Sequence, residues 1–150
     1  MNWPEFFFSL AELTSKKSKD RSTKCGAVIV GPDNEVRSLG YNGFPRGVDD
    51  DVEERHQRPD KYLWTEHAER NAIYNAARAG ICLKGCALYL QWQPCSDCAR
   101  AIIQSGITKV YCLYREKTVA DPVWQKTLAV GQLMLLEAGV EYILVYPKNE

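Results

Sequence analysis

The sequence has no excess of charge of either sign, because Lys plus Arg and Asp plus Glu number 19 each among its 150 residues. Proteins that bind nucleic-acid polymers usually carry a basic excess or a basic stripe, so this balance argues against a polynucleotide partner. It leaves room for a single phosphorylated nucleotide, which a few local cations can hold.

A long apolar run is also missing. The apolar cluster at residues 6–8 follows no basic segment and is far too short to span a bilayer, so we expect neither a signal peptide nor a membrane partner. The six cysteines are therefore expected in a reducing compartment, the cytoplasm, as thiols or metal ligands rather than as a disulfide framework.

No internal repeat, low-complexity tract or linker breaks the sequence, which indicates a single domain over residues 1–150. The composition, 45% hydrophobic and 25% charged, is ordinary for one soluble domain. A chain of this length buries roughly 68–70% of its unfolded surface, which is enough for a sizeable core.

The pattern of apolar residues predicts the first elements. Apolar side chains at helical spacing predict an amphipathic helix that ends near residues 15–20, and these are Phe6, Phe7, Leu10 and Leu13. Two short apolar runs around the turn at 31–34 predict a hairpin of strands at 26–30 and 36–41. The polar stretch from 42 to about 62 predicts a long loop, of a kind that is often functional.

The rest of the chain alternates between helices and strands. The predicted elements are a helix at about 66–79, a strand at 87–92, a helix at about 96–105, a strand at 109–113, a helix at about 124–137 and a strand at 142–145. This alternation implies a largely parallel sheet covered on both faces, and the opening hairpin makes the sheet mixed. We therefore expect an α/β fold with a mixed five-stranded sheet in three α/β/α layers.

Two of the predicted helices begin with side chains that bind metals. His67 and Glu69 lie at the start of one helix, and Cys95 and Cys98 lie at the start of the next. Because the two cysteines are three residues apart, both thiolates can face one point from the first helical turn. The positive end of the helix dipole lowers the thiol pKa and favours the thiolate that zinc needs. Since each helix follows a strand or loop, the two N-termini can converge at one edge of the sheet.

One histidine and two cysteines give three protein ligands, whereas a structural zinc site normally closes with a fourth. Three ligands leave the fourth position to a water molecule, whose pKa the metal lowers to about 7. Glu69, two residues from His67, is well placed to shuttle protons between that water and a substrate. The pattern favours a catalytic zinc site.

Other uses of a Cys-x-x-Cys pair are open from that motif alone. Such a pair is more often a redox couple or half of a zinc ribbon. The presence of His67 and Glu69 at a helix start argues against redox use. A ribbon needs a second pair, and Cys82 with Cys86 has a different spacing and straddles a predicted turn. The two remaining cysteines adjoin apolar strands and are expected as core thiols: Cys25 and Cys112.

His-x-Glu followed by Pro-Cys-x-x-Cys resembles the signature of the zinc-dependent nucleoside and nucleotide deaminases. Four segments narrow this resemblance to the deoxycytidylate (dCMP) deaminases: residues 19–30, 40–47, 67–73 and 104–107. The most specific is Gly-Tyr-Asn-Gly-Phe-Pro-Arg-Gly at 40–47. The resemblance covers nearly the whole chain. It implies a cytidine-deaminase-like fold and hydrolytic conversion of dCMP to dUMP and ammonia.

The resemblance also implies roles for individual residues. The zinc ligands are His67, Cys95 and Cys98, and the proton shuttle is Glu69. Asn42 resembles an asparagine that reaches the nucleotide, while the backbone of Ala68 and the carbonyls near Pro94 would read the pyrimidine edge. The groups suited to the 5′-phosphate are Arg21, Ser22 and Lys24, with Tyr114 as a further candidate for phosphate or base. Ordinary surface solvation explains the two cations equally well.

Members of this family are typically homo-oligomers, often hexamers, that dCTP activates and that dTTP with Mg²⁺ inhibits. The resemblance therefore implies regulatory groups in the loop after the second strand: Gly43, Arg46 for phosphates, and Asp49, Asp50 and Asp51 near a Mg²⁺ ion. Arg78, late on the zinc helix, is expected to face a neighbouring subunit. A solvated acidic loop explains the three aspartates at least as well from the residues alone.

Two rival functions remain at this point. A deaminase of free cytidine or deoxycytidine, or of adenosine in tRNA, carries the same zinc motif, although the lack of a basic stripe argues against tRNA. The rival from another class is a non-catalytic interaction module that zinc stabilises. Glu69 argues against the module, because that residue is not needed to hold the metal.

Overall fold

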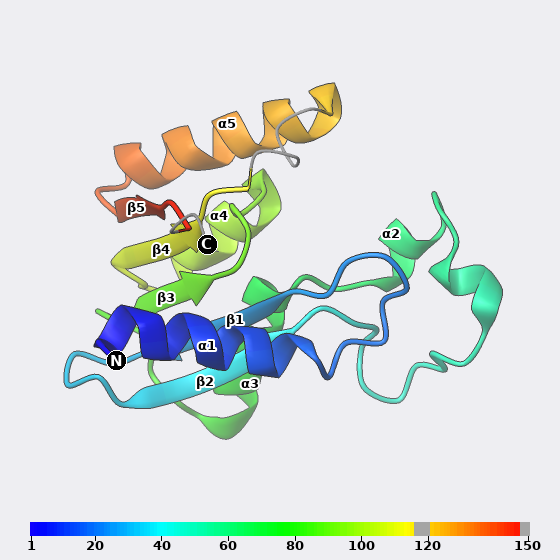
Figure 1. The fold of residues 1–150 in the computed structure, drawn as a ribbon, viewed down its shortest axis with the longest axis horizontal. Coiled ribbons are helices and arrows are strands. Elements are labelled where there is room, and N and C mark those ends of the chain that lie inside the picture. The colour runs from blue at the N-terminus through cyan, green and yellow to red at the C-terminus, as the bar shows by residue number, and fades with distance from the viewer. Residues whose placement is uncertain (116–120, 148–150) are drawn as a thin grey trace.

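A computed structural model describes residues 1–115 and 121–147 of the chain (Figure 1). Its centre is one five-stranded sheet with the order β2-β1-β3-β4-β5. The strands are β1 (Gly26–Val30), β2 (Val36–Tyr41), β3 (Ala87–Leu90), β4 (Lys109–Leu113) and β5 (Glu141–Val145). The predicted α/β fold with a mixed five-stranded sheet is confirmed.

The strand directions divide the sheet into two halves. β1 runs antiparallel to both of its neighbours, β2 and β3, whereas β3, β4 and β5 are parallel. Two of the four strand pairs are therefore antiparallel, so the sheet is less parallel than the alternation of elements predicts. The reason is that β1 is inserted between β2 and β3 and opposes both, so β2 and β3 run in the same direction.

Helices cover both faces of this sheet. α1 (Trp3–Ser15) packs on one face, and the other face carries α3 (Ala68–Ala79), α4 (Ser96–Gln104) and α5 (Pro122–Glu137). Figure 1 shows α1 crossing in front of β1 and β2, with α3 behind them. The stretch predicted as a plain loop contains a 3₁₀ turn, η1 (Glu53–His56), and the start of a short helix, α2 (Lys61–Trp64).

The buried side of α1 differs from the predicted apolar stripe. Phe7 and Ala11 are fully buried, whereas Phe6 and Leu13 are 42% and 61% exposed. The cause is close packing on β1, because a Cβ atom on Gly26 would lie 1.9 Å from the carbonyl oxygen of Ala11. The helix therefore turns Ala11, its smallest side chain, toward Gly26 on β1. This orientation leaves Phe6 and Leu13 at the surface.

α3 lies equally close to β2. A Cβ atom on Gly40 would lie 2.3 Å from both the carbonyl oxygen of Ala68 and the amide nitrogen of Ala72. The Ser38 hydroxyl donates a 2.6 Å hydrogen bond to the carbonyl oxygen of Ala72, and the Asn75 amide donates to the carbonyl oxygen of Leu39 at 2.7 Å. These contacts hold the backbone of α3 against the strand.

No helix in the described part of the chain is long and apolar enough to cross a bilayer.

Replacing Gly40 by Ala should push α3 away from β2, because the added methyl group meets backbone atoms that cannot turn aside. We expect a loss of about 1–3 kcal/mol in the free energy of unfolding, as for other overpacked sites. Urea denaturation measures it, and the metal content after dialysis reports whether the start of α3 has moved.

Gly43→Ala is the matched control, since its Cβ atom would meet only a ring atom of Tyr41 at 3.9 Å. Equal stability and equal metal content in the two variants would show that the close approach of α3 to β2 is unimportant.

Candidate active site

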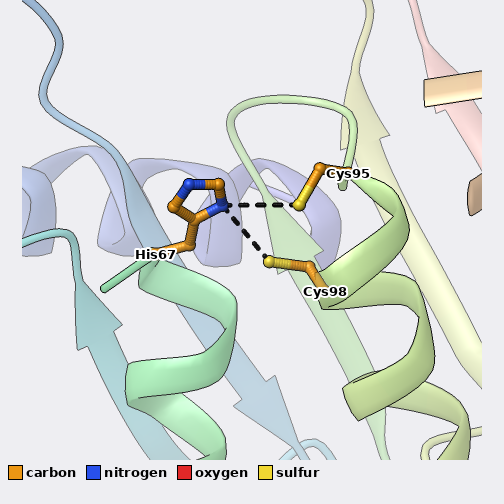
Figure 2. A group of neighbouring side chains, drawn as sticks. All are labelled: His67, Cys95 and Cys98. Carbon is orange, nitrogen blue, oxygen red and sulfur yellow. Dashed lines mark hydrogen bonds between the residues drawn. The ribbon is translucent and has the colours of Figure 1, made fainter. Parts of the chain in front are cut away.

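Three metal-binding side chains meet at the starts of α3 and α4. His67 is the N-cap residue of α3, Cys95 is the N-cap residue of α4, and Cys98 lies in the first turn of α4. The Nδ1 atom of His67 lies 3.6 Å from Sγ of Cys95 and 3.4 Å from Sγ of Cys98 (Figure 2). The predicted convergence of the two helix N-termini is therefore confirmed.

The direction of the strands explains why these helices begin side by side. Because β2 and β3 both run antiparallel to β1, their carboxyl ends lie at the same edge of the sheet. The chain leaves β3 directly into α4, and it returns from the loop after β2 into α3 through a bridge between Gly43 and Glu66. Both helices thus start above one edge.

The donor set fits a zinc ion. A tetrahedral zinc with its usual bond lengths to imidazole nitrogen and thiolate sulfur separates those atoms by about 3.5 Å. The two nitrogen–sulfur distances agree with that value, and all three donor atoms lie within 4.8 Å of one another. Within the described part of the chain, this is the only group of three His, Cys, Asp or Glu side chains that could share a metal ion.

The two thiols differ sharply in acidity. A hydrogen bond from Cys98, together with the nearby imidazole of His67, lowers the pKa of Cys95 to about 4. The same hydrogen bond and burial raise the pKa of Cys98. The protein by itself thus stabilises one thiolate. A bound metal that takes both sulfurs as thiolates displaces the proton that they share.

Glu69 belongs to the same cluster. It lies in the first turn of α3 with 7% of its surface exposed. Burial raises the pKa of its carboxyl group, while the charge of His67 lowers it. A hydrogen bond with Cys98 also lowers this pKa, so the carboxyl group of Glu69 contacts one of the three candidate ligands.

An arginine connects the two helix starts. The guanidinium group of Arg70 contacts Glu66 at 2.5 Å and Asp97, on α4, at 3.5 Å. Neighbouring Arg100 also pairs with Asp97. These charges fix the first turns of α3 and α4 relative to each other.

The backbone groups expected to read the base lie next to the ligands. Ala68 follows His67, Pro94 precedes Cys95, and both Ala68 and Pro94 are buried. Their contact with a pyrimidine stays a prediction.

Asn42 is 8% exposed and fastens the chain just before β1. Its side-chain amide donates to the carbonyl oxygen of Thr23, and its side-chain oxygen accepts from the backbone N–H of Cys25, both at 2.8 Å. Its backbone oxygen accepts from the hydroxyl of Ser18 at 2.7 Å. The structure thus gives Asn42 a positioning role, and its contact with a substrate remains a prediction.

The candidate phosphate residues lie on the segment that Asn42 fastens. Arg21 pairs with Glu53 at 3.1 Å on the surface, and Lys24 is exposed. The hydroxyl of Ser22 faces Asp20, whose Oδ1 atom also accepts the backbone N–H groups of Ser22 and Thr23 at 2.8 and 2.9 Å.

Lys61, which no sequence motif indicates, reaches this segment from α2. Its ammonium group donates to the hydroxyl of Ser22 at 2.8 Å and lies 3.3 Å from Asp20, with side-chain exposures of 9% and 7% for the Lys61–Asp20 pair. Burial alone would raise the pKa of Asp20, but the backbone N–H groups of Thr23 and Ser22, together with Lys61, lower it. Lys61 and Asp20 are 41 residues apart, so no local sequence pattern indicates this buried pair.

Tyr114 and Arg115 lie at the carboxyl end of β4. The Tyr114 ring is 5.0 Å from that of Tyr146, and Arg115 donates to the carbonyl oxygen of Gln91 at 3.3 Å across the edge of the sheet. Arg115 is a further cation at the edge where α3 and α4 start, and no motif of the sequence includes it. Its position two residues past the predicted strand at 109–113 was the available signal.

The loop after β2 is attached to the metal helix at two points. Gly43 and Glu66 exchange backbone hydrogen bonds of 3.1 and 2.9 Å directly before His67. Further along the loop, the guanidinium group of Arg46 donates to the side chain of Asn75 on α3 at 2.6 Å. A change in this loop can therefore reach the start of α3.

The acidic part of the loop makes internal contacts. Asp49 accepts from the backbone N–H of Asp51 at 3.0 Å, and Asp50 forms an ion pair of 2.8 Å with Lys19. Arg78 is exposed near the end of α3. The predicted contacts of these residues with Mg²⁺ or a second subunit stay predictions.

Comparison with known proteins agrees with this site. The family model of the cytidine and deoxycytidylate deaminase zinc-binding region matches residues 1–114. The "uncharacterized deaminase in luxG 3′region" of Aliivibrio fischeri is 44% identical over 139 residues, which are 93% of this chain and 90% of that protein. The deoxycytidylate deaminase of Mus musculus is 41% identical over 153 residues, covering 99% of this chain and 82% of that protein.

A solved structure shares the whole fold. The dCMP deaminase of the cyanophage S-TIM5, in complex with dCMP and dUMP, superposes with a TM-score of 0.73 at 29% identity, over 94% of this chain and 95% of that one. The resemblance seen in the motifs thus extends over sequence and fold. This chain belongs to the cytidine and deoxycytidylate deaminase family.

Proposed function

We propose that this protein catalyses the zinc-dependent hydrolytic deamination of dCMP to dUMP and ammonia. The observation that carries the proposal is the buried carboxyl group of Glu69, which contacts Cys98, next to the three donors that the described part of the chain brings together: His67, Cys95 and Cys98. Three protein ligands leave a coordination position open, as catalytic zinc sites require. Relatives named deoxycytidylate deaminases, and a related structure with dCMP and dUMP, support the choice of substrate.

In this proposal His67, Cys95 and Cys98 hold the metal and Glu69 moves the protons. When bound, zinc supplies a coordinated water whose pKa is lowered to about 7. Glu69 accepts a proton from the attacking water as the new C4–O bond forms, and it delivers this proton to N3 of the ring. It then carries the second proton of the water to the amino group, the C4–N bond breaks and ammonia leaves. Atoms balance as dCMP plus water giving dUMP plus ammonia.

The 5′-phosphate is proposed to bind at the segment that Asn42 and Asp20 organise. Arg21, Ser22 and Lys24 present two cations and a hydroxyl there, and Tyr114 is the further candidate at the end of β4. Multiple backbone hydrogen bonds to Asp20 support the proposal, because they fix the segment before any ligand arrives. A free nucleoside lacks the group that these cations would bind.

The regulatory part of the proposal is activation by dCTP and inhibition by dTTP with Mg²⁺, in a homo-oligomer with a hexamer as the expected form. The attachments of the loop at Gly43 and Arg46 to α3 support it, because a ligand that orders this loop acts on the helix that carries His67 and Glu69. Coupling requires only that the ligand bind two loop states unequally.

Glu69→Ala and Cys95→Ser should fail in different ways. Glu69→Ala should keep about one zinc ion per chain and lose at least the 10²–10⁴-fold in kcat that a general acid–base residue contributes. Cys95→Ser should lose zinc affinity and activity together, because the metal loses a thiolate ligand. Metal analysis of dialysed protein and the rate of ammonia release measure the two effects.

Cys82→Ser is the matched control, since Cys82 is an exposed thiol outside the metal cluster. It should retain zinc and activity. Parallel loss of zinc and activity in Glu69→Ala would assign Glu69 a structural role, and a fully active, zinc-loaded Cys95→Ser protein would remove Cys95 from the ligand set.

The wild-type protein should turn over dCMP faster than deoxycytidine, CMP or an RNA hairpin. Arg21→Gln or Lys24→Gln should raise KM for dCMP about tenfold or more, the size of one charge-assisted hydrogen bond, with a smaller effect on kcat. Steady-state kinetics with dCMP and deoxycytidine test this, because the nucleoside should be insensitive to either change.

Lys84→Gln removes the same charge near the amino end of β3, away from the edge that carries the metal cluster, and serves as the control. Equal effects of Arg21→Gln or Lys24→Gln on both substrates would move the phosphate contact to other groups such as Tyr114.

Addition of dCTP should lower, and dTTP with Mg²⁺ should raise, the dCMP concentration that gives half-maximal rate. A coupling of about 1–3 kcal/mol corresponds to a change of roughly 5–150-fold. Arg46→Ala should blunt both responses while leaving zinc content and maximal rate largely intact. Hyperbolic kinetics that neither triphosphate alters, in a preparation shown to be oligomeric, would contradict the regulatory proposal and leave an unregulated deaminase.

A further inference from the structure

Trp124 lies beside the imidazole of His67. The centroids of the two rings are 6.3 Å apart and their planes are inclined by 30°, within the range of interacting aromatic pairs. Trp124 is half-buried in the first turn of α5, a helix that carries none of the three metal-binding side chains. A third helix therefore reaches the metal cluster.

The start of α5 is held in place by contacts with α4. The hydroxyl of Thr127 accepts the backbone N–H of Ser96 at 2.9 Å and shares a second hydrogen bond of 2.8 Å with the Ser96 hydroxyl. One turn further, Gly131 lies so close to the segment that enters α4 that a Cβ atom would be 3.1 Å from the carbonyl oxygen of Pro94. Because positions 124, 127 and 131 follow helical spacing, the contacts with α4 also fix the side of α5 that carries Trp124.

The surroundings of Trp124 differ from those of a core residue. It belongs to neither apolar core cluster of the described structure, and the adjacent Val123 is 77% exposed. Its ring contact is with the polar imidazole of His67. A large aromatic surface held next to a metal ligand, without being enclosed in the core, is suited to receive a flat ring that binds at the metal.

We propose that Trp124 is a substrate-binding residue that packs against the pyrimidine ring of the substrate. This inference rests on the proposed function, because it needs a pyrimidine to react beside His67. Stacking of a base on an aromatic side chain contributes about 1–3 kcal/mol, which corresponds to roughly 5–150-fold in affinity.

Binding of dUMP, the proposed product, tests this inference without turnover. Isothermal titration calorimetry with zinc-loaded protein should show about 5–150-fold weaker dUMP binding for Trp124→Ala and a smaller loss for Trp124→Phe, which keeps a ring. Binding of 2-deoxyribose 5-phosphate, which has the sugar and phosphate but no base, should not change. Val123→Ala, at the exposed neighbouring position, is the matched control and should bind dUMP like the wild type.

Three results would overturn the inference. The first is unchanged dUMP affinity in zinc-loaded Trp124→Ala protein. The second is equal weakening of dUMP and 2-deoxyribose 5-phosphate binding, which would mean a general disturbance of the site. The third is loss of zinc from both Trp124 variants, which would make Trp124 a support for His67. Failure of the proposed function is distinguishable, because the wild-type protein itself would then neither deaminate dCMP nor bind dUMP, and this inference would fall with it.

Discussion

The site depends on two helices, α3 and α4, that begin close together above one edge of the sheet. β1 opposes both neighbours, so β2 and β3 point the same way and the elements that follow them start at the same edge. Gly40 allows the backbone of α3 to lie on β2, and Gly131 allows α5 to lie on the turn at Cys95. These approaches place one imidazole and two thiols around a single point, within the positive ends of two helix dipoles. The close packing of backbone at Gly40 and Gly131 thus determines where the three metal-binding side chains lie.

The loops around the cluster are fixed by buried polar groups. The side chain of Asn42 binds backbone groups just before β1. The carboxylate of Asp20 accepts the backbone N–H groups of Ser22 and Thr23. Lys61, on α2, contacts both Asp20 and the hydroxyl of Ser22. A buried lysine is rare unless it is paired, which explains why Lys61 and Asp20 occur together. This network joins the segment proposed for the phosphate to the segment that enters α3. The proposed phosphate-binding segment and the metal-binding side chains are therefore held by one hydrogen-bonded network.

Local sequence signals were sufficient for the parts of the site that lie on one helical turn. The spacing of Cys95 and Cys98, and of His67 and Glu69, predicts which side chains face together. The strand and helix order likewise predicts the five-stranded α/β fold. The predicted apolar stripe of α1 was wrong at Phe6 and Leu13, because a glycine on a distant strand decides which side of the helix can approach the sheet. Lys61 and Trp124 escaped prediction for the same reason, since their partners are far away in the sequence and no periodicity connects them.

The proposed chemistry requires a metal centre with three protein ligands and an open position. X-ray absorption spectroscopy of the zinc-loaded protein tests this requirement directly. We expect two sulfur neighbours at about 2.3 Å and two nitrogen or oxygen neighbours at about 2.0–2.1 Å, one from imidazole and one from solvent. Addition of a small ligand such as cyanide should replace the solvent neighbour while both sulfurs remain. Three or four sulfur neighbours, or a centre that no added ligand can enter, would identify a closed structural site and contradict catalysis at this metal centre.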